Sequence, residues 1–274
     1  MNSSHRASKI GGFKQKRPAV SGATCFFRNR ALFQAVRELI QSLNKEECSV
    51  LFHSCSVGAE VYSFMISCLE DPGFTKQIKI HATDINPDYL NFANQGEYPL
   101  CNVNELTPEE RKYFLPTTEN RAIADAILRE KIHFLNPCDF RTFKTQQNFD
   151  VVFVLNSLCY VNSPEQALAI SQIARYNSGY LVLHGAHLNT IKGDLINNGY
   201  IPVCYKGKEI SAAWHLSHLK GADVLTKITD ELLIKPMGKE HYFSDILRLL
   251  LFRVRCPYKT HSIFAKTVGK SNDS

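Results

Sequence analysis

The residues best placed for chemistry in this 274-residue chain follow an apolar run, in the segment Ser49 to Ser63, S-V-L-F-H-S-C-S-V-G-A-E-V-Y-S. The apolar half predicts a buried strand, and the small residues around Gly58 predict a turn into a helix. Such a turn directs backbone N–H groups and the helix dipole at a ligand above the sheet. Asp84 follows the next predicted strand, where a ribose-binding acid lies in a Rossmann-type unit. These features predict a nucleotide-like cofactor.

Two H-x-x-H pairs have the residue type of metal ligands, His184 with His187 and His215 with His218. Helical spacing would be needed for both pairs to converge on a metal, yet His184 ends a predicted strand and no carboxylate partner stands nearby. We therefore expect no metal site. His187 is better suited to face a substrate, where a histidine with an ordinary pKa can act as general base.

Strand and helix patterns alternate along the chain. Helical periodicity covers Ala31 to Leu43 and Glu60 to Leu69, and Asn86 before Pro87 indicates another helix start. Ser163-Pro164-Glu165 opens a further helix to about Tyr176. This alternation predicts an α/β fold with a doubly wound sheet of buried parallel strands. The strand candidates are Val50–His53, Ile78–Thr83, Lys131–Leu135, Val151–Leu155, Tyr180–His184, Ile201–Tyr205 and His261–Lys266.

Composition fits one large domain, because 44% hydrophobic and 21% charged residues can bury one substantial core. No apolar run approaches the roughly 18 residues of a membrane span, and no signal peptide is visible, so we expect a cytoplasmic protein without a membrane partner. The nine cysteines contain no C-x-x-C pair and indicate reduced thiols. The charge of +6 gathers at the chain ends, which favours solvated arms over a nucleic-acid-binding face.

The expected organisation is a single domain, residues 21–268, between a basic arm and a short tail. Two segments interrupt the alternation of strands and helices. The first carries a capped helical turn and a short hairpin. The second is a crossover over the sheet, which we expect to bring Trp214 to the wall of the substrate site. In residue numbers, the arm is 1–20, the hairpin insertion about 97–130, the crossover about 206–260 and the tail 269–274.

Several segments resemble, in order, motifs of the CheR family, S-adenosylmethionine-dependent methyltransferases that act on glutamates of chemotaxis receptors. Residues 24–28, T-C-F-F-R, resemble T-x-F-F-R, and residues 54–63 resemble a small-residue turn followed by S-T-G-E-E-P-Y-S. Residues 82–85 read A-T-D-I, residues 91–98 are similar to A-x-x-G-x-Y, and residues 149–160 resemble F-D-x-I-F-C-R-N-V-x-I-Y. The resemblance spans about residues 24–185. It implies a Rossmann-like class I methyltransferase fold, with a mostly parallel seven-stranded sheet flanked by helices and a small hairpin insertion.

The resemblance also implies a cofactor, S-adenosylmethionine, and its product, S-adenosylhomocysteine. Asp84 would bind the ribose hydroxyls and Glu60 the amino acid portion. Asp139 and Phe140 would hold the adenine, with Cys138 as an alternative for that position. Thr24 and Arg28 across the methionine end, and Ser54 and Asn156 at the strand tips, complete the implied set.

Catalysis by such a site would rest on positioning. A carboxylate acceptor is already ionised at pH 7, so methyl transfer to it needs no general base. Arg28 can grip a carboxylate and Tyr160 can donate a hydrogen bond to it; the resemblance implies comparable roles for the arginine and tyrosine at these positions. In the alternative to this catalytic role, Tyr160 is a structural residue that buries its ring and forms a hydrogen bond from its hydroxyl to a nearby group.

The chain departs from the family on the acceptor side. Leu155, in V-L-N-S, stands where C-R-N-V has arginine, and residues 185–188, G-A-H-L, replace G-x-S-E. The paired acids of the turn are reduced to Ala59 and Glu60. Only 23 residues precede Thr24, so we expect the helical N-terminal domain of the chemotaxis enzymes to be absent, and with it a chemotaxis receptor as partner.

Three functions follow from these observations. The first is methyl transfer to a carboxylate of a protein side chain or a small acid. The second, motivated by Leu155 and His187, is methyl transfer to a hydroxyl or amine of a small metabolite. The third is a non-catalytic module that binds S-adenosylmethionine or S-adenosylhomocysteine and a partner; Arg28 and Tyr160 argue against it.

Overall fold

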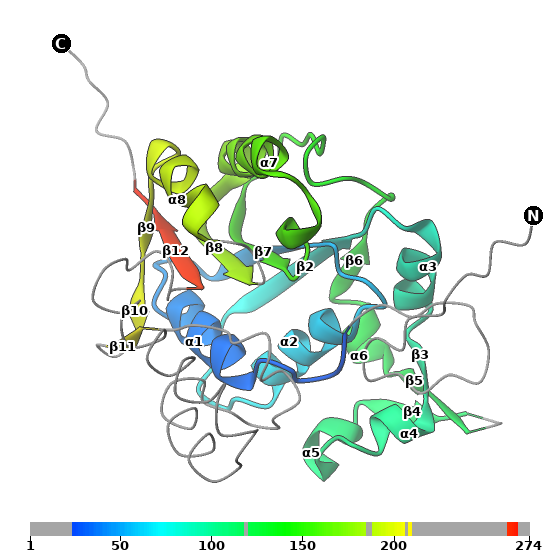
Figure 1. Cartoon of the computed structure of the whole chain (residues 1–274). Coiled ribbons are helices and arrows are strands. Elements are labelled where there is room, and N and C mark those ends of the chain that lie inside the picture. Colours follow the sequence, from blue (N-terminus) through cyan, green and yellow to red (C-terminus); the bar gives the residue numbers. More distant parts are fainter. Residues whose placement is uncertain (1–23, 118–119, 185–187, 206–207, 210–261, 268–274) are drawn as a thin grey trace, which may run out of the picture.

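A mostly parallel seven-stranded sheet forms the centre of the computed structural model, which describes residues 24–117, 120–184, 188–205, 208–209 and 262–267 (Figure 1). The strands are β1 (Glu47–His53), β2 (Gln77–Thr83), β6 (Ile132–Phe134), β7 (Phe149–Leu155), β8 (Asn177–His184), β9 (Tyr200–Pro202) and β12 (Ile263–Lys266). Their order is β6-β2-β1-β7-β8-β12-β9, and β12 runs antiparallel to both of its neighbours. Each strand overlaps a predicted one, so the predicted fold class is confirmed.

Helices cover both faces of this sheet (Figure 1). On one face, α1 (Arg30–Gln41) and α2 (Ala59–Leu69) share a hydrophobic cluster with β1, β2 and β7. On the other, α7 (Ser163–Tyr176) and α8 (Leu188–Asn197) pack against the alternate residues of β7 and β8. All seven positions of β7 are buried, as expected for a central strand covered on both sides.

Helix starts agree with the sequence signals. Asn86 caps α3 (Pro87–Gln95) by accepting a 2.9 Å hydrogen bond from the backbone N–H of Asp88. At α7 the capping residue is Asn162, one position before the predicted opening. Asn162 and Glu165 form a reciprocal capping box, which satisfies two N–H groups that would otherwise lack partners.

The insertion after α3 contains a second sheet, with the order β3-β5-β4. The predicted hairpin is confirmed as β4 (Phe114–Pro116) and β5 (Arg121–Ala124), and β3 (Glu97–Pro99) is an additional strand. The Tyr98 hydroxyl donates a 2.7 Å hydrogen bond to the carbonyl of Val57, which anchors this sheet to the glycine turn. Three short helices complete the insertion, α4 (Leu100–Val103), α5 (Pro108–Arg111) and α6 (Ala126–Arg129).

The arm 1–20, the tail 269–274 and nearly all of the predicted crossover lie outside the described residues. Two short strands are described where the crossover begins, β10 (Cys204–Tyr205) just before it and β11 (Lys208–Glu209) within it. No helix among the described residues is both long enough and apolar enough to cross a membrane.

The turn between β1 and α2 depends on Gly58. Its φ of +82° favours glycine, and a Cβ placed there would lie 2.9 Å from Cβ of Ala93 in α3. The turn is therefore set both by backbone conformation and by the close approach of α3.

We predict that Gly58→Ala lowers the free energy of unfolding by about 2 kcal/mol, because it adds both backbone strain and a steric overlap. Gly193→Ala in α8 is the matched control, since no atom of the described residues lies within 4 Å of the added Cβ, apart from the adjoining residues and the backbone of its own helix. The control should raise stability by about 0.5–1 kcal/mol, the usual gain at a helical glycine. Urea unfolding measures both variants, and equal stability of Gly58→Ala and wild type would contradict the prediction.

Candidate active site

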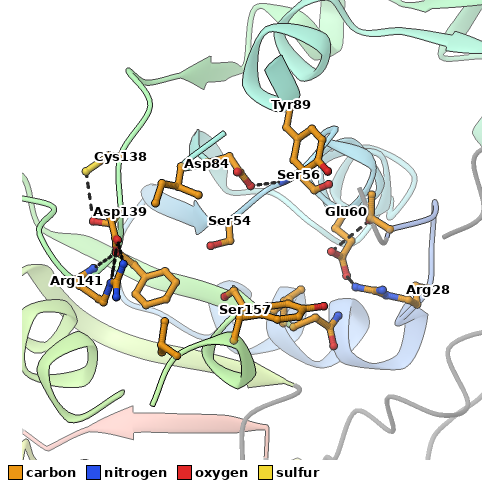
Figure 2. A pocket seen from close by; sticks show the side chains of 17 residues that line it. Arg28, Ser54, Ser56, Glu60, Asp84, Tyr89, Cys138, Asp139, Arg141 and Ser157 are labelled. Carbon is orange, nitrogen blue, oxygen red and sulfur yellow. Dashed lines mark hydrogen bonds and ion pairs between the residues drawn. The ribbon is translucent and has the colours of Figure 1, made fainter. Parts of the chain in front are cut away.

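A cavity of about 490 Å³ lies at the carboxyl ends of β1, β2 and β7 (Figure 2). Every described residue that the sequence assigns to the site lines it; His187 and Trp214 lie outside the described residues. The predicted lining residues are Thr24, Arg28, Ser54, Glu60, Asp84, Cys138, Asp139, Phe140, Asn156 and Tyr160. The structure thus brings together residues that span 137 positions of the sequence, Thr24 to Tyr160.

At one end of the cavity Arg28 and Glu60 form a buried ion pair (Figure 2). Nη2 of Arg28 lies 2.7 Å from Oε1 of Glu60, and both side chains are 7% exposed. The Thr24 hydroxyl donates a 3.4 Å hydrogen bond to the other oxygen of Glu60. Burial lowers the pKa of Arg28, but the Glu60 carboxylate outweighs it and the pKa of Arg28 lies above its usual value. Arg28 therefore stays charged while it holds Glu60 at the start of α2.

Asp84 lies at the middle of the cavity, directly after β2. Its two oxygens accept hydrogen bonds from the backbone N–H groups of Ser56, at 2.8 Å, and Asn86, at 2.9 Å. Burial raises the pKa of Asp84, and these N–H groups act in the opposite direction. Each carboxylate oxygen has more than one lone pair, so both can still accept from a ribose hydroxyl.

The other end of the cavity is built by the loop after β6. The Asp139 carboxylate accepts from the backbone N–H of Arg141 at 2.8 Å and from its Nε at 2.9 Å. This pairing lowers the pKa of Asp139. The Cys138 N–H donates to the Asp84 carbonyl at 3.0 Å, which joins this loop to the end of β2. Both alternatives for adenine, Cys138 and Asp139, line the cavity beside the buried ring of Phe140.

The segment after β7 forms the remaining wall. Leu155 ends the strand and is 5% exposed, whereas Tyr160, in the short 3-10 helix Leu158–Tyr160, is 78% exposed. The interpretation in which Tyr160 buries its ring is therefore wrong. A tyrosine exposed at the cavity wall can reach an incoming acceptor.

Left-handed backbone conformations gather at this cavity. Ser54, Ser56 and Asn156 line it with φ values of +52°, +51° and +54°, and Phe27, next to Arg28, has φ +49°. Such conformations cost about 1–3 kcal/mol each at residues other than glycine and cluster at functional sites. Here they turn the chain sharply at the tips of β1 and β7.

Comparison with known proteins decides the family. Residues 22–194 match the family described as "CheR methyltransferase, SAM binding domain". The chain belongs to the CheR family. This match covers more than half of the chain, and the cofactor of the matched domain is S-adenosylmethionine, as predicted.

Relatives within the CheR family align over part of their length. A protein named as the methyltransferase Cher3 of Pseudomonas putida is 31% identical over 170 residues, 57% of this chain and 61% of that protein. A chemotaxis protein methyltransferase of Borreliella burgdorferi is 26% identical over 189 residues, 66% of this chain and 65% of that protein. The chain thus spans less than two thirds of the length of these relatives.

Two of the solved structures that resemble this chain share less sequence with it than these relatives do. The magnesium protoporphyrin IX methyltransferase of Synechocystis PCC 6803 with bound S-adenosylhomocysteine is 14% identical, with a TM-score of 0.40 over 64% of this chain and 74% of that chain. An N-methyltransferase, NodS from Bradyrhizobium japonicum, gives 17% identity and the same score over 64% and 76%. Similarity at this level adds nothing to the family assignment.

The charges of the cavity fit the cofactor of the CheR family. Three carboxylates, Glu60, Asp84 and Asp139, line it together with two guanidinium groups, Arg28 and Arg141. The sulfonium of S-adenosylmethionine is a cation, so an excess of carboxylates favours it. Among the described residues, no cluster of three or more metal-ligating side chains occurs.

Sequence reasoning missed several lining residues. Ile85 and Ser157 lie inside motifs of the CheR family, A-T-D-I and the segment 149–160, so their place in a motif was the only signal that could have identified them. No motif marked Arg141 or Tyr89, because their place depends on how the loop after β6 and helix α3 pack. The missed residues that line the cavity are Ser56, Ile85, Tyr89, Arg141, Ser157 and Val161.

Beneath the cavity, His53 at the end of β1 is fully buried. Its Nε2 shares a 2.8 Å hydrogen bond with the hydroxyl of Tyr176, and its ring lies against Phe143. Burial lowers the pKa of His53 from 6.5 to about 3. The unfolded chain therefore binds a proton at His53 in the window from pH 6.5 down to 3, while the folded protein does not.

Acidification from pH 7 to pH 5 should consequently destabilise wild type by about 2 kcal/mol more than it destabilises His53→Gln, which keeps a polar partner for Tyr176 but does not titrate. Urea unfolding at the two pH values gives the difference. Parallel behaviour of His53→Gln and wild type would contradict a neutral His53.

Proposed function

We propose that this protein transfers the methyl group of S-adenosylmethionine to a carboxylate, forming a methyl ester and releasing S-adenosylhomocysteine. The observation that carries this proposal is that residues from four segments that match CheR motifs, 24–28, 54–63, 82–85 and 149–160, line one cavity. Membership of the CheR family supports it, as do the names of the relatives, chemotaxis protein methyltransferases.

The residues would act by holding the two reactants in line. S-adenosylmethionine supplies an electrophilic methyl group on a sulfonium. The carboxylate oxygen forms the new O–C bond while the S–C bond breaks, and the electron pair of the S–C bond stays on sulfur. No proton moves, so no general base is needed. Glu60 and Asp84 would fix the cofactor at its amino acid and ribose portions, and Arg28 and Tyr160 would orient the acceptor.

The proposed acceptor is a protein side-chain carboxylate. Tyr160 stands exposed at the wall of the cavity, within reach of a side chain presented by a folded partner. The names of the relatives support a protein substrate. Two expectations stay predictions: a cytoplasmic location, and an acceptor other than a chemotaxis receptor.

One observation favours a second candidate, transfer to a hydroxyl or amine. Leu155 is buried and lines the cavity where the motif C-R-N-V has arginine, so that position offers no cation to a carboxylate. A hydroxyl or amine acceptor would require a base, and His187, proposed for that task, lies outside the described residues.

The product distinguishes the two candidates. Incubation with methyl-labelled S-adenosylmethionine and blocked peptides that contain glutamate should give label that base treatment releases as methanol, because methyl esters are base-labile. Glutamine-containing peptides are the matched control and should stay unlabelled. Base-stable label on a peptide hydroxyl or amine would support the second candidate, and binding without any transfer would support the non-catalytic module.

Asp84 gives a direct test of cofactor placement. We predict that Asp84→Asn weakens binding of S-adenosylhomocysteine roughly ten- to hundredfold, the usual effect of losing hydrogen bonds to a charged group. Asp88→Asn is the matched control, since Asp88 is exposed in the first turn of α3 and does not line the cavity. Calorimetric titration measures both. Wild-type affinity in Asp84→Asn would overturn the assignment of Asp84 to the ribose.

A further inference from the structure

The segment after β7 carries a buried hydroxyl that the proposed mechanism has not used. Ser157 is 8% exposed and lines the cavity, where Figure 2 labels it. Its Oγ has no hydrogen-bond partner among the described residues. A buried hydroxyl without a partner is unfavourable in the folded protein, so a bound ligand is the natural source of its partner.

The backbone around Ser157 holds this hydroxyl in place. Asn156 adopts the left-handed conformation, and residues 155, 156 and 157 all line the cavity as a result. The Ser157 carbonyl accepts a 3.0 Å hydrogen bond from the N–H of Tyr160. The side chain of Gln166 in α7 donates to the carbonyls of Leu158 and Val161, at 2.8 and 3.0 Å. The turn is thus fixed at both ends before any ligand arrives.

Comparison with the motif C-R-N-V shows an exchange of polarity at two positions. The motif has a cation before the asparagine and an apolar valine after it, whereas this chain has Leu155 before Asn156 and Ser157 after it. Both exchanged residues line the cavity. The two cations among the described lining residues are both paired already, Arg28 with Glu60 at 2.7 Å and Arg141 with Asp139 at 2.9 Å. The motif therefore has a charged hydrogen-bond donor at position 155, whereas this chain has a neutral donor two residues later, at position 157.

We propose that Ser157 determines acceptor specificity by donating a hydrogen bond from its hydroxyl to an oxygen of the methyl acceptor. This inference rests on the proposed function and concerns the same cavity. With Tyr160 it would give the acceptor two neutral donors, and binding would depend less on ionic strength than it would with an arginine at position 155.

The test uses the full chain loaded with S-adenosylhomocysteine, with N-acetylglutamate amide as probe because its side-chain carboxylate is its only charge. Titration followed by NMR should show binding to wild type, several-fold weaker binding to Ser157→Ala, and recovery in Ser157→Thr, which keeps the hydroxyl. Affinity for S-adenosylhomocysteine, measured by calorimetry, should stay within twofold in both variants. The ligand-free Ser157→Ala protein should melt at the wild-type temperature or above, because no internal hydrogen bond is removed.

The double variant Leu155→Arg/Ser157→Val restores the residue types of C-R-N-V. It should bind the probe with an affinity that falls as salt rises, whereas wild type should respond less. Equal probe affinity in wild type and Ser157→Ala, or no binding to wild type, would overturn the inference. A parallel loss of S-adenosylhomocysteine affinity in Ser157→Ala would assign the hydroxyl to the cofactor instead. If S-adenosylhomocysteine does not bind wild type at all, it is the proposed function that fails.

Discussion

The buried ion pair between Arg28 and Glu60 is the interaction on which the rest of the site depends. It joins the segment before α1 to the first turn of α2, across 32 residues of sequence. Removing one partner of a buried pair leaves an uncompensated charge, at a cost of about 3–5 kcal/mol. The same two side chains line the cavity. Fold and function therefore constrain these residues together, and loss of activity in an Arg28 variant has to be separated from loss of stability.

The cavity floor is held together by hydrogen bonds between strand tips. The N–H of Cys55 donates to the carbonyl of Thr83 at 3.0 Å, which joins the ends of β1 and β2. Asp84 binds the N–H of Ser56, and its carbonyl accepts from the N–H of Cys138. These bonds lie just beyond the ends of the parallel strands β1, β2 and β6, so the sheet holds in place the groups expected to meet the ribose and the adenine. Such preorganisation reduces the ordering that ligand binding would otherwise require.

The sequence predicted what local patterns determine. Short apolar runs gave all seven strands, since a buried parallel strand needs apolar residues on both faces, and Asn86 with Pro87 gave the start of α3. Strand β3 was missed because its three residues, E-Y-P, become a strand only by pairing with β5, more than 20 positions later. Most cavity residues inside the CheR motifs were found, whereas Tyr89 and Arg141 were not, because packing between distant elements places them there. Whether Tyr160 is buried or exposed likewise depends on the turn around it.

Charge changes during the proposed reaction would favour release of the product from a cavity rich in carboxylates. Before transfer, the sulfonium is attracted by Glu60, Asp84 and Asp139, which outnumber the two lining guanidinium groups. After transfer the sulfur is neutral, so its attraction to these carboxylates weakens. The acceptor has lost its negative charge at the same step, so its attraction to the cations of the cavity weakens as well. With Leu155 in place of an arginine, the acceptor side has one cation fewer to hold an unreacted carboxylate. Neutral donors such as Ser157 and Tyr160 lose less on esterification, because an ester oxygen can still accept a hydrogen bond.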